Sequence, residues 1–151
     1  MFSVGSNTVV TFESLIFDGS TGDYSNTGVF YGGAISADGA TTALECKNVS
    51  LSVYNCEFKD FEAYAGGAIC FHYVEKGTIN VNGSNFTNNK AYNVSGGAIC
   101  FLNSKASTLT VDSSKFMYNS ASSHGGAIAC DASYNSDEED FDSLTITNCV
   151  F

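Results

Sequence analysis

The sequence contains no arginine, no proline and no tryptophan among its 151 residues. All six basic residues are lysines, and 16 acidic residues oppose them, which leaves a formal net charge of −10. A negative field of this size repels phosphate backbones and anionic lipid headgroups, because both carry charge of the same sign. We therefore expect a protein that binds neither nucleic acid nor an anionic membrane surface.

Long apolar runs are also missing. No stretch of about 18 consecutive apolar residues occurs, so we expect no membrane insertion by this segment. The first residues, Met1 to Val10, lack a basic region and a long apolar core, and so do not form a recognisable secretion signal. Hydrophobic residues still make up 44% of the chain, which is enough to fill a core and argues against disorder.

The sequence holds no CxxC motif and no Cys/His cluster with the spacing of metal ligands. Its six cysteines, in an acidic chain rich in Asn, Ser and Thr, favour an oxidising compartment. One acidic run has enough carboxylate oxygens to suggest Ca²⁺, which prefers such ligands. The run consists of Asp137, Glu138, Glu139, Asp140 and Asp142. EF-hand spacing is absent, so a solvated acidic loop is the favoured interpretation and we expect no other cofactor.

The dominant feature of the sequence is an internal repeat. The string Gly-Gly-Ala-Ile occurs four times and supplies the glycine pairs Gly32–Gly33, Gly66–Gly67, Gly96–Gly97 and Gly125–Gly126. A second element alternates with it and is centred on Phe17, Phe58, Phe86, Phe116 and Phe151. Apolar residues stand seven and five positions before each of these phenylalanines. The Phe-to-Phe spacings of 41, 28, 30 and 35 indicate units of about thirty residues with loops of variable length, which is typical of solenoids.

Within each unit the apolar residues alternate at period two, which predicts short strands with one buried face. The parity switches between the apolar pair and the phenylalanine, so a corner must lie between them. The residues at this corner are Ser14, Asn55, Gly83, Ser113 and Asn148. We predict an all-β, right-handed parallel β-helix (β-solenoid) with three short strands per coil and about four to five coils. Helical solenoids are excluded because no window shows the 3.6-residue period.

Two features that recur in the unit predict local structure. The glycine pairs suit a turn that needs positive φ or a close approach of two backbones. Asn89 and Asn119, each three residues after a phenylalanine, are expected to stack as an amide ladder. The insertions at Asp18–Tyr31 and Ser36–Lys47 are expected to project as loops. Because neither end has a recognisable cap, we expect residues 1–151 to be one β-solenoid segment of a longer repeat array.

The combination of Gly-Gly-Ala-Ile with Phe-x-x-Asn, at Phe86–Asn89 and Phe116–Asn119, resembles the polymorphic membrane protein repeats of autotransporter-type adhesins. The resemblance implies a parallel β-helix at the cell surface or outside the cell, with adhesion as its usual role. Its partners would be a protein or glycan on a host or neighbouring cell. Two units depart from the pattern, because Asp18-Gly19-Ser20 and Lys59-Asp60-Phe61 follow the first two phenylalanines. The Asn ladder should therefore be absent there.

A carbohydrate-binding or polysaccharide-processing β-helix is an alternative function. Lyases of this fold typically combine Ca²⁺-binding carboxylates with a basic residue, usually arginine, and this chain has no arginine. His72 and His124 are both expected to be solvated surface residues rather than general bases. We therefore predict that the chain is not an enzyme and has no catalytic residues.

A further alternative is an ice-binding solenoid, because the outward positions of the first strand of each unit are rich in hydroxyl groups. The column comprises Ser50, Ser52, Thr78, Thr108, Thr110, Ser143 and Thr145, and Asn80 interrupts it. Small β-branched hydroxyl residues are also ordinary solvent-facing strand residues. An ordinary solvent-facing strand is therefore the favoured interpretation of this column.

The cysteines provide a test of the register. Cys70 and Cys100 each follow a Gly-Gly-Ala-Ile directly, so they should lie on adjacent coils about 4.8 Å apart. This spacing falls within the Cα window of about 4.4–6.8 Å for a disulfide. Both are expected to point outward, where they could bridge or remain free. Cys56, Cys130 and Cys149 are expected to face inward, and Cys46 to lie in a loop within reach of Cys56.

Overall fold

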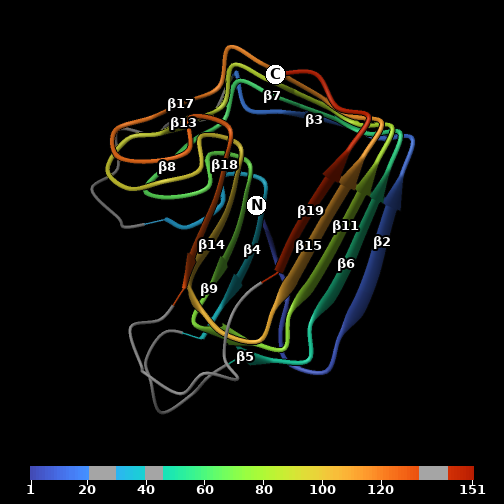
Figure 1. Cartoon of the computed structure of the whole chain (residues 1–151), viewed down its shortest axis with the longest axis vertical. Helices are drawn as coiled ribbons and strands as arrows, with labels where there is room; N and C mark the ends of the chain where they lie inside the picture. Colours follow the sequence, from blue (N-terminus) through green and yellow to red (C-terminus); the bar gives the residue numbers. More distant parts are fainter. Residues whose placement is uncertain (21–29, 40–45, 133–142) are drawn as a thin grey trace.

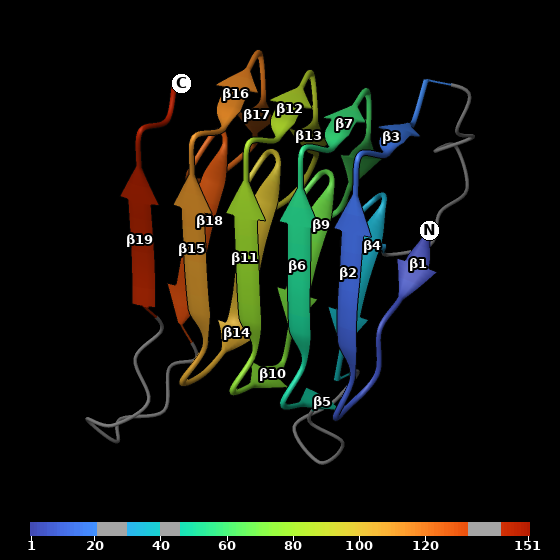
Figure 2. The same cartoon turned by 90° about the vertical axis from the view of Figure 1, so that its right-hand side faces the viewer.

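The computed structural model of the protein describes residues 1–20, 30–39, 46–132 and 143–151. All regular structure in these residues is β, and every strand pairing is parallel. The chain winds as a right-handed coil, and corresponding strands of successive coils lie side by side (Figures 1 and 2). The predicted right-handed parallel β-solenoid is confirmed, and five strands in one column give about four complete turns.

The first side of the solenoid is a five-stranded sheet. Its strands are β2 (Val9–Glu13), β6 (Ser50–Tyr54), β11 (Thr78–Asn82), β15 (Thr108–Asp112) and β19 (Ser143–Thr147). Leu51, Ile79 and Leu109 are in register and fully buried, whereas the residues that alternate with them face outward. The alternation in the sequence thus divides each strand into a core face and a solvent face.

The second side carries the repeated phenylalanines. Its strands are β3 (Ile16–Asp18), β7 (Glu57–Lys59), β12 (Asn85–Thr87) and β16 (Lys115–Met117). The rings of Phe58, Phe86 and Phe116 are stacked almost parallel, with centroids 4.9 and 4.8 Å apart. Phe17 and Phe151 extend the stack at its two ends, at 4.5 and 5.1 Å. The predicted stacking at about 4.8 Å is therefore confirmed.

The third side returns the chain to the start of the next coil. Its strands are β1 (Phe2–Ser3), β4 (Ile35–Asp38), β9 (Ile69–His72), β14 (Ile99–Ser104) and β18 (Ile128–Ala132). Two further sheets of two-residue strands lie at the bends between these sides. They are formed by β8 (Glu62–Ala63), β13 (Lys90–Ala91) and β17 (Ser120–Ala121), and by β5 (Cys46–Lys47) and β10 (Val74–Glu75). The three expected strands per coil thus form the three sides, and these short pairings are additional.

Residues with left-handed backbone conformation mark the bends. The corner predicted from the change of parity has φ between 50° and 61° in all five units, at Ser14, Asn55, Gly83, Ser113 and Asn148. The first glycine of each Gly-Gly-Ala-Ile also has positive φ, for example 68° at Gly96. The second is needed for a different reason, because a Cβ on Gly97 would overlap backbone atoms of Gly126 and Ser120 on the next coil. Both predicted uses of glycine therefore occur, one at each position of the pair.

The expected loop over Ser36–Lys47 is too long. Ser36–Asp38 continue strand β4, where Ser36 pairs with Cys70 and Asp38 with His72, and Cys46–Lys47 form β5. Pairing with β9 satisfies the backbone of residues 36–38, so the coil extends further than the repeat string suggests. In the other insertion, Asp18 is the last residue of β3 and Tyr31 pairs with Ala65. The intervening parts, 21–29 and 40–45, lie outside the described residues.

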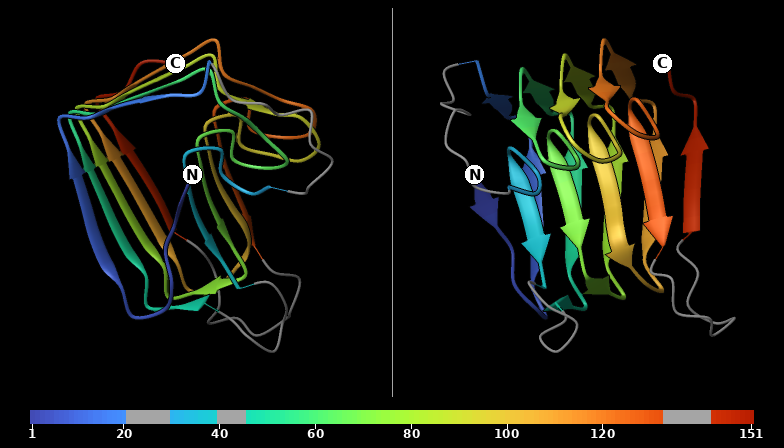
Figure 3. Two further views of the ribbon diagram at one scale, coloured as in Figure 1. Left: turned by 180° about the vertical axis from the view of Figure 1, so that it is seen from behind. Right: turned by 90° about the vertical axis from the view of Figure 1, so that its left-hand side faces the viewer.

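Two apolar clusters stabilise the fold. The inner core fills the coil and includes the phenylalanine stack together with buried Leu, Ile and Val side chains from all three sides. A smaller outer cluster lies on the other face of the β4–β9–β14–β18 sheet. It consists of Ala65, Cys70, Cys100 and Leu102, with Tyr31, Tyr64, Val94 and Ala129 packed against them. The turns that precede β9 and β14 fold back beside this sheet (Figure 3), and their side chains cover its outward face.

Candidate functional site

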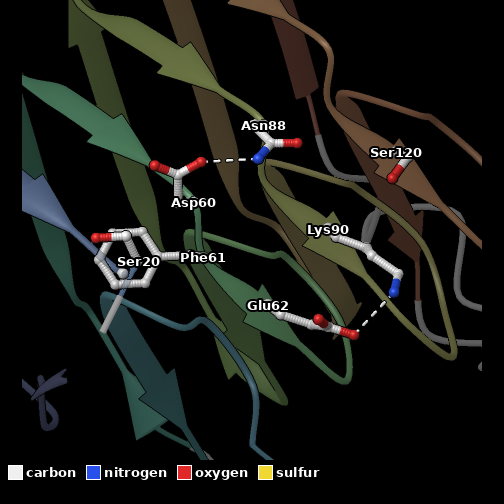
Figure 4. Close-up of a pocket in the computed structure, with 8 residues that line it drawn as sticks. Ser20, Asp60, Phe61, Glu62, Asn88, Lys90 and Ser120 are labelled. Carbon is white, nitrogen blue, oxygen red and sulfur yellow. Dashed lines mark hydrogen bonds and ion pairs between the residues drawn. The ribbon is translucent and has the colours of Figure 1, made fainter. Parts of the chain in front are cut away.

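A polar groove of about 560 Å³ lies on the described surface. It is lined by Gly19, Ser20, Asp60, Phe61, Glu62, Asn88, Lys90 and Ser120, which come from four successive coils. Figure 4 shows Ser20 and Phe61 at one end of the groove and Ser120 at the other. The groove therefore runs along the solenoid axis, beside the bend between the second side and the β8–β13–β17 sheet.

The polar side chains of the groove interact in pairs across neighbouring coils (Figure 4). Asn88 Nδ2 donates a hydrogen bond of 2.7 Å to Asp60 Oδ1. Lys90 Nζ lies 2.9 Å from Glu62 Oε1. Both pairs are solvent-accessible, with 54% of the Lys90 side chain and 36% of the Glu62 side chain exposed. An ion pair this exposed contributes only about 0–1 kcal/mol to stability.

The groove arises where the repeat varies from coil to coil. Two positions after the phenylalanine, the residue is Gly19, Asp60, Asn88 or Tyr118, and the last three all have positive φ. Four positions after it, the residue is Glu62, Lys90 or Ser120 in the three paired short strands. Sequence reasoning missed these residues as a site. The available signal was that solvent-facing positions change charge while core positions repeat.

An amide ladder lies beneath the groove, as expected for Asn89 and Asn119. Asn89 Nδ2 donates to Phe58 O and to Asn119 Oδ1, both at 3.0 Å. Asn119 repeats the arrangement one coil later, where its Nδ2 donates to Phe86 O at 2.9 Å and its Oδ1 accepts from the Asn89 backbone N–H at 3.0 Å. Phe61 takes the corresponding place in the preceding coil and lies in the inner core instead. The ladder is therefore interrupted there, as predicted.

The hydroxyl-rich column is in register along the first side. Ser50, Thr78, Thr108 and Ser143 are aligned in one row. Ser52, Asn80, Thr110 and Thr145 are aligned in a second row. At the end of the strands Asp112 accepts hydrogen bonds from Thr147 Oγ1 and Asn148 Nδ2, and these bonds lower the pKa of its carboxyl group. The face is thus regular and nearly uncharged except at this edge.

His72 does not lie in solvent, contrary to expectation. Its side chain is buried beneath the Tyr31 ring, whose centroid is 3.8 Å from that of the imidazole, and His72 Nδ1 lies 3.0 Å from Asp38 Oδ1. Burial lowers the pKa of His72, although the Asp38 carboxylate opposes that shift. The prediction failed because Tyr31, from the preceding coil, covers a position that faces away from the inner core. His124 is exposed, as expected.

Cys70 and Cys100 are paired in register, as predicted, and face away from the inner core. They are nevertheless fully buried in the outer cluster, so outward direction did not mean solvent exposure. Burial raises the pKa of the Cys70 thiol well above its usual range, and Cys100 is its hydrogen-bond partner. Both are thiols in the structure, and a disulfide between them stays a prediction. A buried, protonated thiol is a poor nucleophile, which argues against a catalytic role.

The remaining cysteines contact the inner core. Cys56 is buried in it, and Cys130 and Cys149 pack against it, as expected. Cys46 was expected in a loop but lies in β5, where it is buried in the same core and its Sγ is 3.8 Å from Val4 O. A strand of two residues is too short to produce a recognisable alternation, which explains the error.

The described residues contain no group of three or more His, Cys, Asp or Glu side chains placed to bind a metal ion. The calcium candidate (Asp137, Glu138, Glu139, Asp140 and Asp142) lies outside the described residues. In the part of the chain that the structure covers, no helix is long and apolar enough to cross a membrane.

Comparison with protein families places two segments of the chain in a known repeat type. The model of the Chlamydia polymorphic membrane protein repeat matches residues 83–102 and 113–131, about a quarter of the chain. These segments contain two of the four phenylalanine strands (β12 and β16), Asn89, Asn119 and two Gly-Gly-Ala-Ile strings. The match confirms the resemblance seen in the sequence, and the parallel β-solenoid is consistent with it. Comparisons with curated proteins and with solved structures gave no significant match.

Proposed function

We propose that the chain is part of a structural and adhesive rod, carried at the cell surface or outside the cell, that binds a protein or glycan on another cell. One observation carries this proposal: the inner core repeats from coil to coil while solvent-facing positions near the groove do not. The phenylalanine stack is the same in every coil, whereas Glu62, Lys90 and Ser120 occupy equivalent places outside. A rigid repeated scaffold that carries varied surface residues is suited to recognition.

The other findings agree with this proposal. The Chlamydia polymorphic membrane protein repeat names a family of membrane proteins, which supports a surface location. The net charge of −10 supports a partner other than nucleic acid or a bare anionic bilayer. We further propose that the rod has no enzymatic activity, because the two histidines and the groove carboxylates do not form a nucleophile–base pair. His72 contacts Asp38 but is covered by Tyr31.

Two measurements test the proposal. Antibodies raised against the chain should label intact, unpermeabilised source cells, and the fluorescently labelled chain should bind cell surfaces saturably. Prior treatment of the target cells with protease or glycosidase should reduce the binding. Labelling only after permeabilisation, together with binding no greater than that of an unrelated β-solenoid, would contradict the adhesive function. Cleavage of a polysaccharide by the purified chain would contradict the proposed absence of enzymatic activity.

Ice binding is a second candidate, supported by the two in-register rows of Ser and Thr on the first side. A regular, nearly uncharged hydroxyl face is the feature that favours it. Thermal hysteresis that disappears when Thr108 and Thr110 are replaced by lysine would support this function. An ordinary freezing curve for the intact chain would reject it.

A further inference from the structure

We propose that the groove lined by Asp60, Glu62, Asn88 and Lys90 is a saccharide-binding site for an uncharged oligosaccharide that lies along the solenoid axis. This inference rests on the proposed adhesive function and names the chemical class of ligand. The groove has a volume of about 560 Å³, which is within the range of about 300–1,000 Å³ that is usual for ligand sites.

The shape of the groove fits an extended chain molecule better than a compact one. Its lining residues come from four successive coils, from Ser20 to Ser120. With about 4.8 Å between coils, three steps give a length of roughly 14 Å. A ligand that runs parallel to the axis would meet a new set of side chains at each step, and an oligosaccharide of a few units has this form.

The hydrogen-bonding groups of the groove suit sugar hydroxyls, which both donate and accept. Asp60 and Glu62 each use one carboxylate oxygen in the contacts with Asn88 and Lys90, so a second oxygen remains to accept from a ligand. The Lys90 ammonium has two further N–H donors, and Asn88 has its amide oxygen. Adjacent donors and acceptors of this kind can hold vicinal hydroxyls, while Phe61, whose ring is buried in the inner core, bounds the groove at one end.

The existing contacts are weak enough for a ligand to replace or share. More than half of the Lys90 side chain is exposed, so its pairing with Glu62 is screened by water and adds little stability. A ligand hydroxyl that bridges Lys90 and Glu62 would therefore disrupt an ion pair that contributes little free energy. The backbone beneath is held by the ladder of Asn89 and Asn119, which places the groove on a rigid support.

The charge of the site selects among saccharides. Asp60 and Glu62 outnumber Lys90, and the whole chain carries a net charge of −10. Uronic acids, sulfated glycans and sialylated glycans would be repelled by this field. Uncharged sugars avoid the repulsion and can use every donor and acceptor in the groove.

The test is a titration of the complete chain with neutral hexasaccharides (cellohexaose, mannohexaose and N-acetylchitohexaose), with heparin and polygalacturonate as anionic probes. Backbone-amide NMR shifts report the location of binding, and calorimetry reports its affinity. We expect at least one neutral hexasaccharide to bind and to shift resonances of residues 60–62 and 88–90, and the anionic probes not to bind. Binding of anionic probes alone, shifts confined to another face, or no binding of any neutral hexasaccharide would overturn the inference.

Variants sharpen the result. Lys90→Ala should weaken binding by roughly tenfold, because a hydrogen bond from a charged donor is lost. Lys47→Ala is the matched control, since Lys47 is also an exposed lysine paired with a glutamate of the neighbouring coil, Glu75, but lies outside the groove. Ser120→Phe should obstruct the groove without touching the core. Equal affinity for all these variants, at unchanged circular dichroism, would show that the groove is not the site.

The same variants separate this inference from the proposed function. If the chain binds cells and Lys90→Ala binds them as strongly, the groove assignment is wrong and the adhesive function stands. If the chain binds a neutral hexasaccharide in the groove but no cell surface, the site is correct and the adhesive function is wrong.

Discussion

The inner core and the outer cluster are both apolar and both buried, yet they differ in how the repeat produces them. In the inner core, identical residues stack on one another, and the rings of Phe58, Phe86 and Phe116 are within 3° of parallel. In the outer cluster, Cys70, Cys100 and Leu102 are covered by unlike residues from separate turns. The comparison shows that a solenoid can bury both faces of one of its sheets, but that only the inner face follows directly from the repeat.

The largest effect is expected in the inner core. Phe86→Ala removes a fully buried ring from the middle of the stack, and we expect it to lower the free energy of unfolding by about 3–5 kcal/mol. Urea unfolding followed by circular dichroism measures the change. Tyr118→Ala is the control, because Tyr118 is 81% exposed and lies two residues after the next phenylalanine of the stack. Similar losses for the two variants would contradict the stabilising role of the buried stack.

The outer cluster provides the next test. A disulfide between Cys70 and Cys100 would close a loop of about thirty residues and stabilise the fold by about 3–4 kcal/mol in the chain-entropy account. Mass mapping under non-reducing conditions should show a Cys70–Cys100 peptide in material folded under oxidising conditions, and reduction should then lower stability. Cys70 linked to Cys149 instead would show that the coil register is wrong.

Leu102→Ala compares the two clusters directly. Leu102 is 7% exposed and belongs to the smaller cluster, so we expect a loss near the lower end of the usual range, about 2 kcal/mol. Leu109→Ala is the matched variant in the inner core, where the side chain is fully buried. Unfolding by urea should rank Leu109→Ala as the more destabilising change. The reverse order would mean that the outer cluster contributes more than its size suggests.

The smallest expected effect concerns pH. The pKa of His72 is lower in the folded chain than its ordinary value of 6.5. Stability should therefore be full above pH 6.5 and should fall as the pH drops below 6.5 towards the folded pKa, because the unfolded chain binds the proton more readily. His72→Leu, which copies the leucine of the next coil, should abolish this slope between pH 7.5 and 5.5.

The carboxyl groups with lowered pKa do not obscure this test. The pKa of Asp18 is lowered to about 2 by its hydrogen bonds with Ser20 and with Lys59, and that of Asp112 is lowered as well. Both titrate below the range studied. A slope that persists unchanged in His72→Leu would assign the pH dependence to another group.

Much of the fold follows from local pattern. Alternation at period two, the phenylalanine column and the Asn, Gly and Ser corners each depend on a few neighbouring residues, and a repeat presents them several times. Alternation, however, tells only on which side of a strand a residue lies. Whether that side is covered depends on a turn from another coil, which is why the burial of His72 and Cys70 could not be predicted. The groove has the same origin, since it combines side chains of four coils.

The direction of the hydrogen bonds between coils has a mechanical consequence. These bonds join each coil only to its neighbours and lie along the rod, as in Asn55 N–H to Asn82 O and Asn85 N–H to Cys56 O. A pull applied along the rod loads them one coil at a time, so the solenoid yields by peeling rather than by shearing as a whole. A coil of thirty residues that advances about 4.8 Å when folded spans roughly 100 Å when drawn out. Each released coil would therefore become about twenty times longer than it was when folded, and would let a tensioned attachment lengthen gradually before it detaches.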